Sequence, residues 1–217
     1  MKWYTAIGKK VNHYDGKFHV RNHRYEEKVL SGMEIFLWTS LLWSFTEESD
    51  IYDRMKKLLH LTFPEEERKE ADIEEFRYCF RRLCIRGLVI ACEGDTKKAA
   101  AAELIGKATV ELTNACFHDR YINFLVSVVH GNGFCFSLRI FKKNPLEKQH
   151  KKLLERMKQQ GEIGVYMEEM QIEERRAGQN AFWICERQKE FLDIVTELYR
   201  MKIIMIRTVK RGGAFEE

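Results

Sequence analysis

The apolar residues of this chain repeat one helical pattern twice, about 115 residues apart. Four apolar residues spaced i, i+3, i+4 and i+7 make each copy: Phe76, Cys79, Phe80 and Leu83 in the first, and Phe191, Ile194, Val195 and Leu198 in the second. This spacing places the four side chains on one face of an amphipathic helix. After a short turn, each copy continues into a β-rich apolar run, Leu88–Ile90 or Ile203–Met205, which predicts a strand. The repetition predicts two related units in the chain.

The residues before the first copy predict a hairpin and two further helices. Lys10–Tyr14 and Lys17–Arg21 flank Asp15-Gly16, a dipeptide favoured in tight hairpin turns. Ser31 can cap a largely apolar helix over 32–45, the predicted central helix of the first unit. A second amphipathic helix is predicted over 48–61. The third helix, which carries the first copy, is predicted to begin at 71 or 72 and to end at Gly87, a residue suited to a left-handed helix exit.

The middle of the chain, residues 97–144, allows two interpretations. The composition of 99–105 favours a helix. The runs 121–130 and 134–141 flank Asn132-Gly133 and favour a second hairpin, whereas a long helix through 108–129 is the competing interpretation. Asn144-Pro145 predicts the start of a helix over 146–160. Farther on, a short helix is predicted over 165–176, and Gly178–Asn180 precede the last helix.

These patterns predict a mainly α fold with short β elements, which is the α+β class. The predicted organisation is an N-terminal unit over 1–97, a connecting segment with a helix and a hairpin over 98–143, and a C-terminal unit over 144–217. A length of 217 residues and an apolar fraction of 45% are sufficient for units with real cores. Only 2 prolines and 13 glycines argue against a many-turned β-sandwich.

Charge and cysteine usage narrow the class of protein further. The net charge of +4 permits a polyanionic partner without requiring one. The first ten residues lack the apolar core of a signal peptide, and no apolar run is long enough to cross a bilayer. The 6 cysteines form no Cys-x-x-Cys pair, and we interpret Cys79, Cys84, Cys92 and Cys185 as reduced core or near-core thiols. A cytoplasmic protein with no membrane partner is expected.

Three stretches resemble the winged helix-turn-helix domains of bacterial transcription regulators. Val29–Trp38 is similar to the opening of such domains, in which a strand and Leu-Ser precede an apolar helix that carries a glutamate. Leu83–Val89 resembles their Leu-x-x-x-Gly-Leu-Val exit from the recognition helix. Within 146–211, Leu198–Ile204 resembles a Leu-Tyr-x-x-x-Ile-Ile run that leads into a wing. The resemblance implies tandem winged-helix units that bind double-stranded DNA and regulate transcription.

One departure from the family concerns the wing. After Gly94-Asp95 the chain continues into Lys97-Lys98 and an alanine run, so the returning wing strand of the first unit is expected to be missing or very short. The second unit reaches Gly212-Gly213 with an equally truncated wing. Contacts of a wing with the minor groove are therefore in doubt.

The polar face of the first unit's third helix supplies the candidate DNA-binding residues. Removing its apolar face leaves a band of cationic and aromatic residues: Arg77, Tyr78, Arg81, Arg82 and Arg86. Arginine offers a fork of donors that suits both phosphate and the major-groove edge of guanine. Lys97 and Lys98 are predicted to grip the DNA backbone. The second copy exposes Asp193, Thr196, Glu197 and Arg200, a poor surface for a polyanion, and is predicted to be structural or to face a partner.

A non-catalytic winged-helix module that binds another protein is the alternative function. No phosphate loop, nucleophile elbow or His-Glu-x-x-His motif occurs, so we expect no enzyme, no cofactor and no metal. A homodimer is expected, because one helix reads only a few base pairs and a second copy doubles the half-site. The apolar residues of the middle segment, from Ile122 to Phe136, are the predicted interface. The sequence identifies no small-molecule effector.

Overall fold

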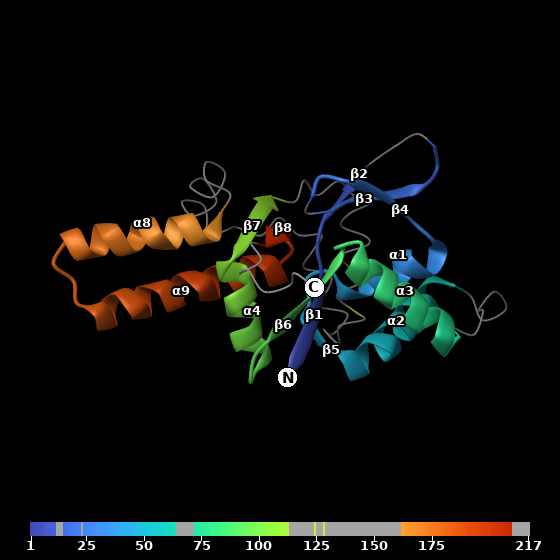
Figure 1. The fold of residues 1–217 in the computed structure, drawn as a ribbon. Coiled ribbons are helices and arrows are strands. Elements are labelled where there is room, and N and C mark those ends of the chain that lie inside the picture. Colours follow the sequence, from blue (N-terminus) through green and yellow to red (C-terminus); the bar gives the residue numbers. More distant parts are fainter. Residues whose placement is uncertain are drawn as a thin grey trace.

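The computed structural model describes residues 1–11, 15–22, 24–63, 72–112, 124, 128 and 162–209. Helices alternate with small antiparallel sheets, which confirms the predicted α+β class (Figure 1). The helices are α1 (Gly32–Leu41), α2 (Glu48–Thr62), α3 (Ile73–Ile85), α4 (Lys97–Gly106), α8 (Ile163–Arg176) and α9 (Ala181–Arg200). The strands are β1 (Lys2–Ala6), β2 (Lys9–Val11), β3 (Phe18–Arg21), β4 (Glu27–Leu30), β5 (Thr46–Glu47), β6 (Val89–Glu93), β7 (Ala108–Leu112) and β8 (Ile204–Val209).

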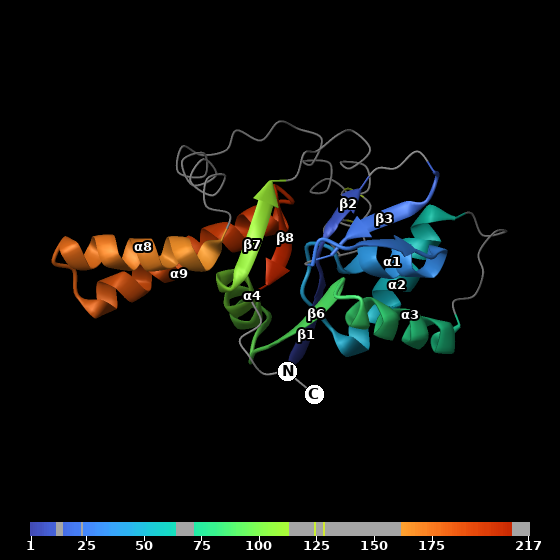
Figure 2. The same cartoon turned by 45° about the horizontal axis from the view of Figure 1, so that its top comes forward.

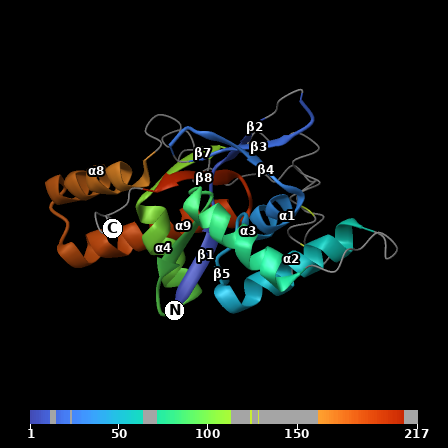
Figure 3. The same ribbon diagram turned by 45° about the vertical axis from the view of Figure 1, so that its right-hand side comes forward.

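Strand β1 is the centre of the first sheet, whose order is β5-β1-β6. It runs antiparallel to β6 from Lys2 opposite Glu93 to Ala6 opposite Val89. The strand beside β6 therefore comes from the N-terminus of the chain. After Gly94 the chain enters α4 at Lys97, so β6 is followed by a helix and not by a returning wing strand, as the sequence predicted. Helices α1, α2 and α3 lie together beside this sheet (Figure 3).

The predicted N-terminal hairpin is confirmed and gains a third strand. Strands β2 and β3 pair around Asp15-Gly16, and β4 pairs with β3 on the other side. Gly16 has a φ of +71°, the left-handed conformation that this dipeptide favours. At the β3–β4 turn, the Asn22 side chain donates to the carbonyl of Arg86 over 3.0 Å. This turn therefore lies against the end of α3.

Helix α1 ends at Leu41, so its predicted extension to residue 45 is wrong. Leu42 is extended and Trp43 has a φ of +54°, which stops the helical hydrogen bonding. The turn brings the Trp43 indole close to the C-terminal part of the chain, where it donates to the carbonyl of Ile204 over 3.0 Å. An apolar sequence alone does not show this end, because the constraint comes from a strand far along the chain.

The repeated helix–turn–strand pattern is confirmed. Helix α3 leads into β6 and α9 leads into β8, each through a short turn. Leu88 donates its N–H to the carbonyl of Leu83 over 2.9 Å, and Ile203 makes the equivalent 3.0 Å bond to Leu198. The turn residue is left-handed in both copies, with a φ of +66° at Gly87 and +62° at Lys202.

Strand pairing extends this repeat to the sheets. In the first sheet, Trp3 lies opposite Glu47, and Tyr4 lies opposite Ala91. Strand β7 makes the equivalent pairs, because Thr109 bridges Glu162 just before α8 and Val110 lies opposite Ile206 in β8. Strand β7 thus corresponds to β1. It pairs with β8 in a two-stranded sheet, although it lies in the segment 98–143 that we predicted to be a connector.

Some of the remaining predictions for the second half fall on described residues and can be compared with the structure, whereas others do not. Helix α4 confirms the helix over 99–105, and α8 and α9 confirm the two C-terminal helices. The strand at Ala108–Leu112 shows that a helix beginning at 108 is wrong. The hairpin over 121–141, the helix over 146–160 and the dimer interface from Ile122 to Phe136 lie outside the described residues, apart from isolated positions. No described helix is long and apolar enough to cross a membrane.

The two units share one continuous apolar core. Buried residues from Tyr4 in β1 to Ile206 in β8 belong to the same cluster. Polar contacts cross between the units as well, because the Thr5 and Tyr199 hydroxyls lie 2.9 Å apart and the N–H of Gly8 donates to the carbonyl of Ile206 over 3.2 Å. Both hydroxyl-bearing residues are buried. The relative position of the units is therefore fixed by packing and not by a loose linker.

The left-handed turn at Gly87 leads to a prediction about stability. Replacing Gly87 with alanine places a Cβ in a conformation that costs L-residues roughly 1–2 kcal/mol, so the free energy of unfolding should fall by about that amount. Gly32→Ala is the matched control, because Gly32 starts α1 and a Cβ there meets open space. Urea unfolding of both variants measures the difference. Equal stability of the two variants would contradict the role of this turn.

The equivalent turn of the second unit leads to a prediction about pH. Lys202 is buried, and its ammonium lies 5.7 Å from the centre of the Trp43 ring. Burial lowers the pKa of Lys202 to about 7, whereas the unfolded chain keeps a pKa near 10.4. Between these values the unfolded chain binds the extra proton, so raising the pH from 7 to about 10 should stabilise the wild type relative to Lys202→Met. A stability difference that is independent of pH would contradict this burial.

Candidate nucleic-acid interface

Helix α3 carries most of the predicted DNA-binding residues, and local chemistry fixes both of its ends. The Asp72 carboxylate accepts the N–H of Glu74 over 3.1 Å, which caps the N-terminus. Gly87 supplies the left-handed exit at the other end. Between them, Phe76, Cys79 and Leu83 are buried and hold the helix against the core. The opposite face is thereby directed to solvent.

The exposed face of α3 displays three of the predicted residues, Arg77, Tyr78 and Arg81. The Arg77 side chain is 65% exposed and pairs with Glu74 over 2.9 Å, one turn earlier on the same helix. The Tyr78 ring lies under the Arg82 guanidinium, 5.5 Å from ring centre to guanidinium carbon. The outward placement expected for Arg77, Tyr78 and Arg81 is confirmed, which leaves their role in DNA binding as a prediction.

Glu34 of α1 is a buried anion beneath the same helix. Its side chain is 0% exposed, and its carboxylate accepts bonds from Arg82 Nε at 3.2 Å and from Arg86 Nη1 at 3.1 Å. It also accepts the N–H of Ser31 over 2.9 Å, so it helps to cap α1. A buried carboxylate is tolerated only when it is paired and hydrogen-bonded. Glu34 therefore joins the start of α1 to the last turn of α3.

Arg86 is not on the outward band where the sequence placed it. It follows the last residue of α3, and its side chain is only 21% exposed. Besides its bonds to Glu34, its Nη2 donates to the carbonyl of Val29 over 2.9 Å. Protein acceptors thus occupy the fork of donors that we had predicted for DNA, and Arg82 is shared between Glu34 and the surface. The signal that could have revealed this pairing is a single glutamate within an otherwise apolar helix.

Lys97 and Lys98 form a second group at the start of α4, where Thr96 caps the helix. Lys98 pairs with Asp193 of α9 over 2.8 Å. Burial lowers the pKa of Lys97, and the nearby positive charges of Arg54 and Arg200 lower it further. The described neighbours of these two lysines therefore lie on α9 and α2, not on α3. The predicted site residues fall into two separate groups.

Helix α4 packs on the face of α9 that corresponds to the exposed face of α3. Leu192 and Asp193 occupy the positions equivalent to Arg77 and Tyr78, 115 residues farther along the chain. Asp193 binds Lys98, and a Cβ added to Gly106 would lie 3.9 Å from a methyl group of Leu192. The linking helix thus occupies in the second unit the face that stays open in the first.

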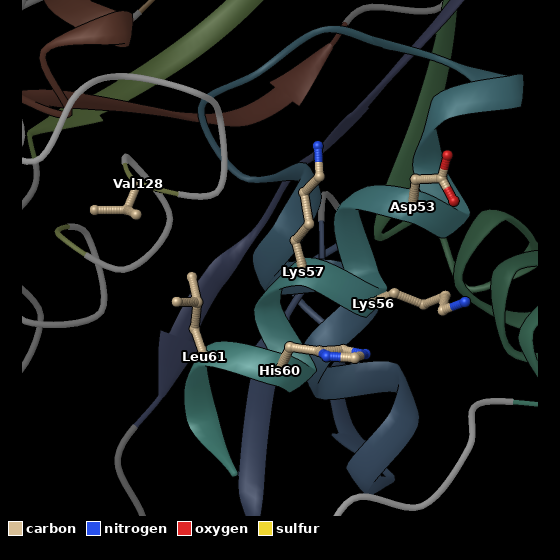
Figure 4. A pocket seen from close by; sticks show the side chains of 6 residues that line it. All are labelled: Asp53, Lys56, Lys57, His60, Leu61 and Val128. Carbon is tan, nitrogen blue, oxygen red and sulfur yellow. The ribbon is translucent and has the colours of Figure 1, made fainter. Parts of the chain in front are cut away.

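A shallow hollow of about 460 Å³ lies on the outer side of α2 (Figure 4). It is lined by Asp53, Lys56, Lys57, His60, Leu61 and Val128. Leu61 lies on the side of the hollow nearest Val128, whereas Lys56 and Asp53 point away from it (Figure 4). The hollow contains none of the predicted DNA-binding residues, and its charges are of both signs.

The structure also shows the surroundings of several histidine and cysteine side chains. Among the described residues, no group of histidine, cysteine and acidic side chains is arranged to hold a metal ion. The His19 ring pairs with Asp15 over 2.8 Å. Burial raises the pKa of the Cys92 thiol to about 12, which makes it a poor nucleophile. Cys185, which we expected in or near the core, is instead exposed.

Comparisons of the chain with protein families, curated proteins and solved structures find no match.

The Glu34 cluster predicts a large effect of one substitution. Glu34→Ala should lower the free energy of unfolding by about 3 kcal/mol, the lower end for a broken buried ion pair, because both arginines retain some exposure. Glu74→Ala is the matched control, since its exposed pair with Arg77 should contribute less than about 1 kcal/mol. Urea unfolding followed by circular dichroism measures both. A similar destabilisation of the two variants would contradict the anchoring role of Glu34.

Proposed function

We propose that this protein is a DNA-binding transcription regulator built from two winged-helix units. The order α1, β5, α2, α3 and β6 supports this assignment for the first unit, with β1 as the third strand of the sheet. In the second unit, α8, α9 and β8 follow the same order, with β7 in the place of β1. The observation that carries the proposal is the exposed, arginine-bearing face of α3 on a helix whose other face is fixed in the core.

In this mechanism α3 enters the major groove of double-stranded DNA. Arg77 and Arg81 are one turn apart, so both can reach the same groove and contact phosphates or guanine edges. Tyr78 lies between them, with its ring exposed for packing on the DNA backbone or on bases. The exposed Arg77–Glu74 pair exchanges for an Arg77–phosphate pair at small cost, because exposed ion pairs contribute little.

Arg82 and Arg86 act in this mechanism mainly as positioning residues. Their bonds to Glu34 hold the last turn of α3 at a defined angle to α1. The β3–β4 turn abuts the same end of α3 and exposes Arg24, so it can take the role of the wing. Lys97 and Lys98 remain candidates for backbone contacts outside the groove.

Salt dependence of DNA binding tests this proposal. Arg77→Ala/Arg81→Ala should weaken binding to genomic DNA fragments and reduce the slope of log K against log salt by about one unit for each phosphate that the variant no longer neutralises. Where an arginine reads a base, discrimination should fall by roughly 1–3 kcal/mol. Fluorescence anisotropy at several salt concentrations measures both quantities.

The control is Lys107→Ala/Lys189→Ala, which removes the same charge from α4 and α9. Lys107 is the C-cap of α4, and Lys189 lies in α9. Like Arg77, each of these lysines pairs with a glutamate three or four residues earlier in the chain, over 2.7 Å. The control should bind DNA nearly as tightly as the wild type. If the α3 variant binds as well as this control does, the exposed face of α3 is not the DNA-binding surface.

A winged-helix module that binds a protein is the second candidate function. It is favoured by apolar exposure on the same helix, because Ile73, Tyr78 and Ile85 are 48%, 62% and 76% exposed. The equivalent face of α9 already packs against a helix, α4. This candidate predicts that the wild type fails to bind DNA even at low salt, a result that would exclude the regulator.

A further inference from the structure

Helices α8 and α9 form an antiparallel hairpin that extends away from the rest of the protein (Figures 1 and 2). Gly178 turns the chain with a φ of +78°, and Asn180 caps α9 by accepting the N–H of Trp183. Apolar side chains are exposed at this outer end, with Ile172 51%, Phe182 74% and Trp183 47% exposed. Large apolar exposure grouped on a projecting element is typical of a contact surface.

The inner face of α8 is already used within the hairpin. The Tyr166 ring stacks on Phe191 of α9 with ring centres 4.6 Å apart, and Gln188 donates to the carbonyl of Met167 over 3.4 Å. Glu174 faces Arg187 of α9. The opposite face of α8 consists of residues three or four apart that are all exposed: Glu168, Glu169, Ile172, Arg175 and Arg176.

The charges on this outer face are arranged symmetrically about Ile172. Two glutamates lie three and four residues before it, and two arginines lie three and four residues after it. When two copies of such a helix pack antiparallel and cross at Ile172, the half before Ile172 in one copy lies against the half after it in the other. Residues seven apart share one side of a helix, so Glu168 faces Arg175 of the second copy and Glu169 faces Arg176. Both pairs occur twice because the contact is two-fold symmetric.

We propose that the outer face of α8 is a dimerisation surface whose partner is a second copy of this chain. Ile172 meets Ile172 of the second copy at the two-fold axis, and four Glu–Arg pairs surround this contact. The same charges set the orientation, because a parallel arrangement places like charges together. This proposal is independent of DNA binding, and it assigns the dimer to a surface other than the middle segment predicted from the sequence.

The size of the contact sets its expected strength. Two crossing helices bury less than the roughly 1,200–2,000 Å² of a standard stable interface. We therefore expect a dimer that dissociates within the micromolar range and is weakened by salt. Sedimentation velocity of the full chain, without DNA, measures this equilibrium.

Charge reversal provides a sharp test of the surface. One variant is Glu168→Arg/Glu169→Arg, which makes the outer face wholly positive, and the other is Arg175→Glu/Arg176→Glu, which makes it wholly negative. Each variant alone should be monomeric at concentrations where the wild type is dimeric. An equimolar mixture should restore the dimer, because each glutamate again faces an arginine. Circular dichroism of each variant checks that it is folded.

Restoration by mixing supports the proposal, since a variant that had merely unfolded would not recover a partner. The proposal would be overturned if the wild type remained a monomer at roughly 100 μM. It would also be overturned if either variant alone formed a dimer as stable as that of the wild type. Neither result bears on the DNA contact of α3, which the anisotropy titration measures separately. Ile172→Ser should weaken the wild-type dimer severalfold without changing its response to salt.

Discussion

The orientation of α3 depends on one buried carboxylate. Glu34 is fully enclosed, and its carboxylate is held by Arg82, Arg86 and the N–H of Ser31. This requirement fixes the distance and angle between the first turn of α1 and the last turn of α3. Together with the burial of the apolar face of α3, this connection directs Arg77 and Arg81, on which the proposed DNA contact rests, to solvent.

The described residues of the second unit repeat part of the first. The turn after α9 repeats the hydrogen bonds of the turn after α3, and β7 repeats the pairing of β1. The two units differ at the equivalent helix faces. Helix α4 packs on that face of α9, whereas the same face of α3 is exposed. Trp43 and Tyr199 join the two units through buried hydrogen bonds. These bonds fix the position of the open face of α3 relative to the occupied face of α9.

Local signals predicted the helices well and the long-range pairings poorly. The spacing around Phe76 and Phe191, and the cap at Ser31, depend on neighbouring residues and were visible in the sequence. The place of β1 beside β6 was missed because its partner lies almost 90 residues away. Arg86 was misplaced for the same reason, since its acceptor Glu34 lies on another helix and 52 residues earlier in the chain.

The exposed face of α3 is the surface that we propose contacts DNA. Site-specific photo-crosslinking tests it most directly, with a photoreactive phenylalanine analogue in place of Tyr78 or of Phe182, both of which are more than half exposed. With radiolabelled genomic fragments at low salt, the account predicts a DNA adduct from position 78 and none from position 182 at the end of the α8–α9 hairpin. An adduct from position 182 alone, or from neither position while the protein binds DNA, would contradict it.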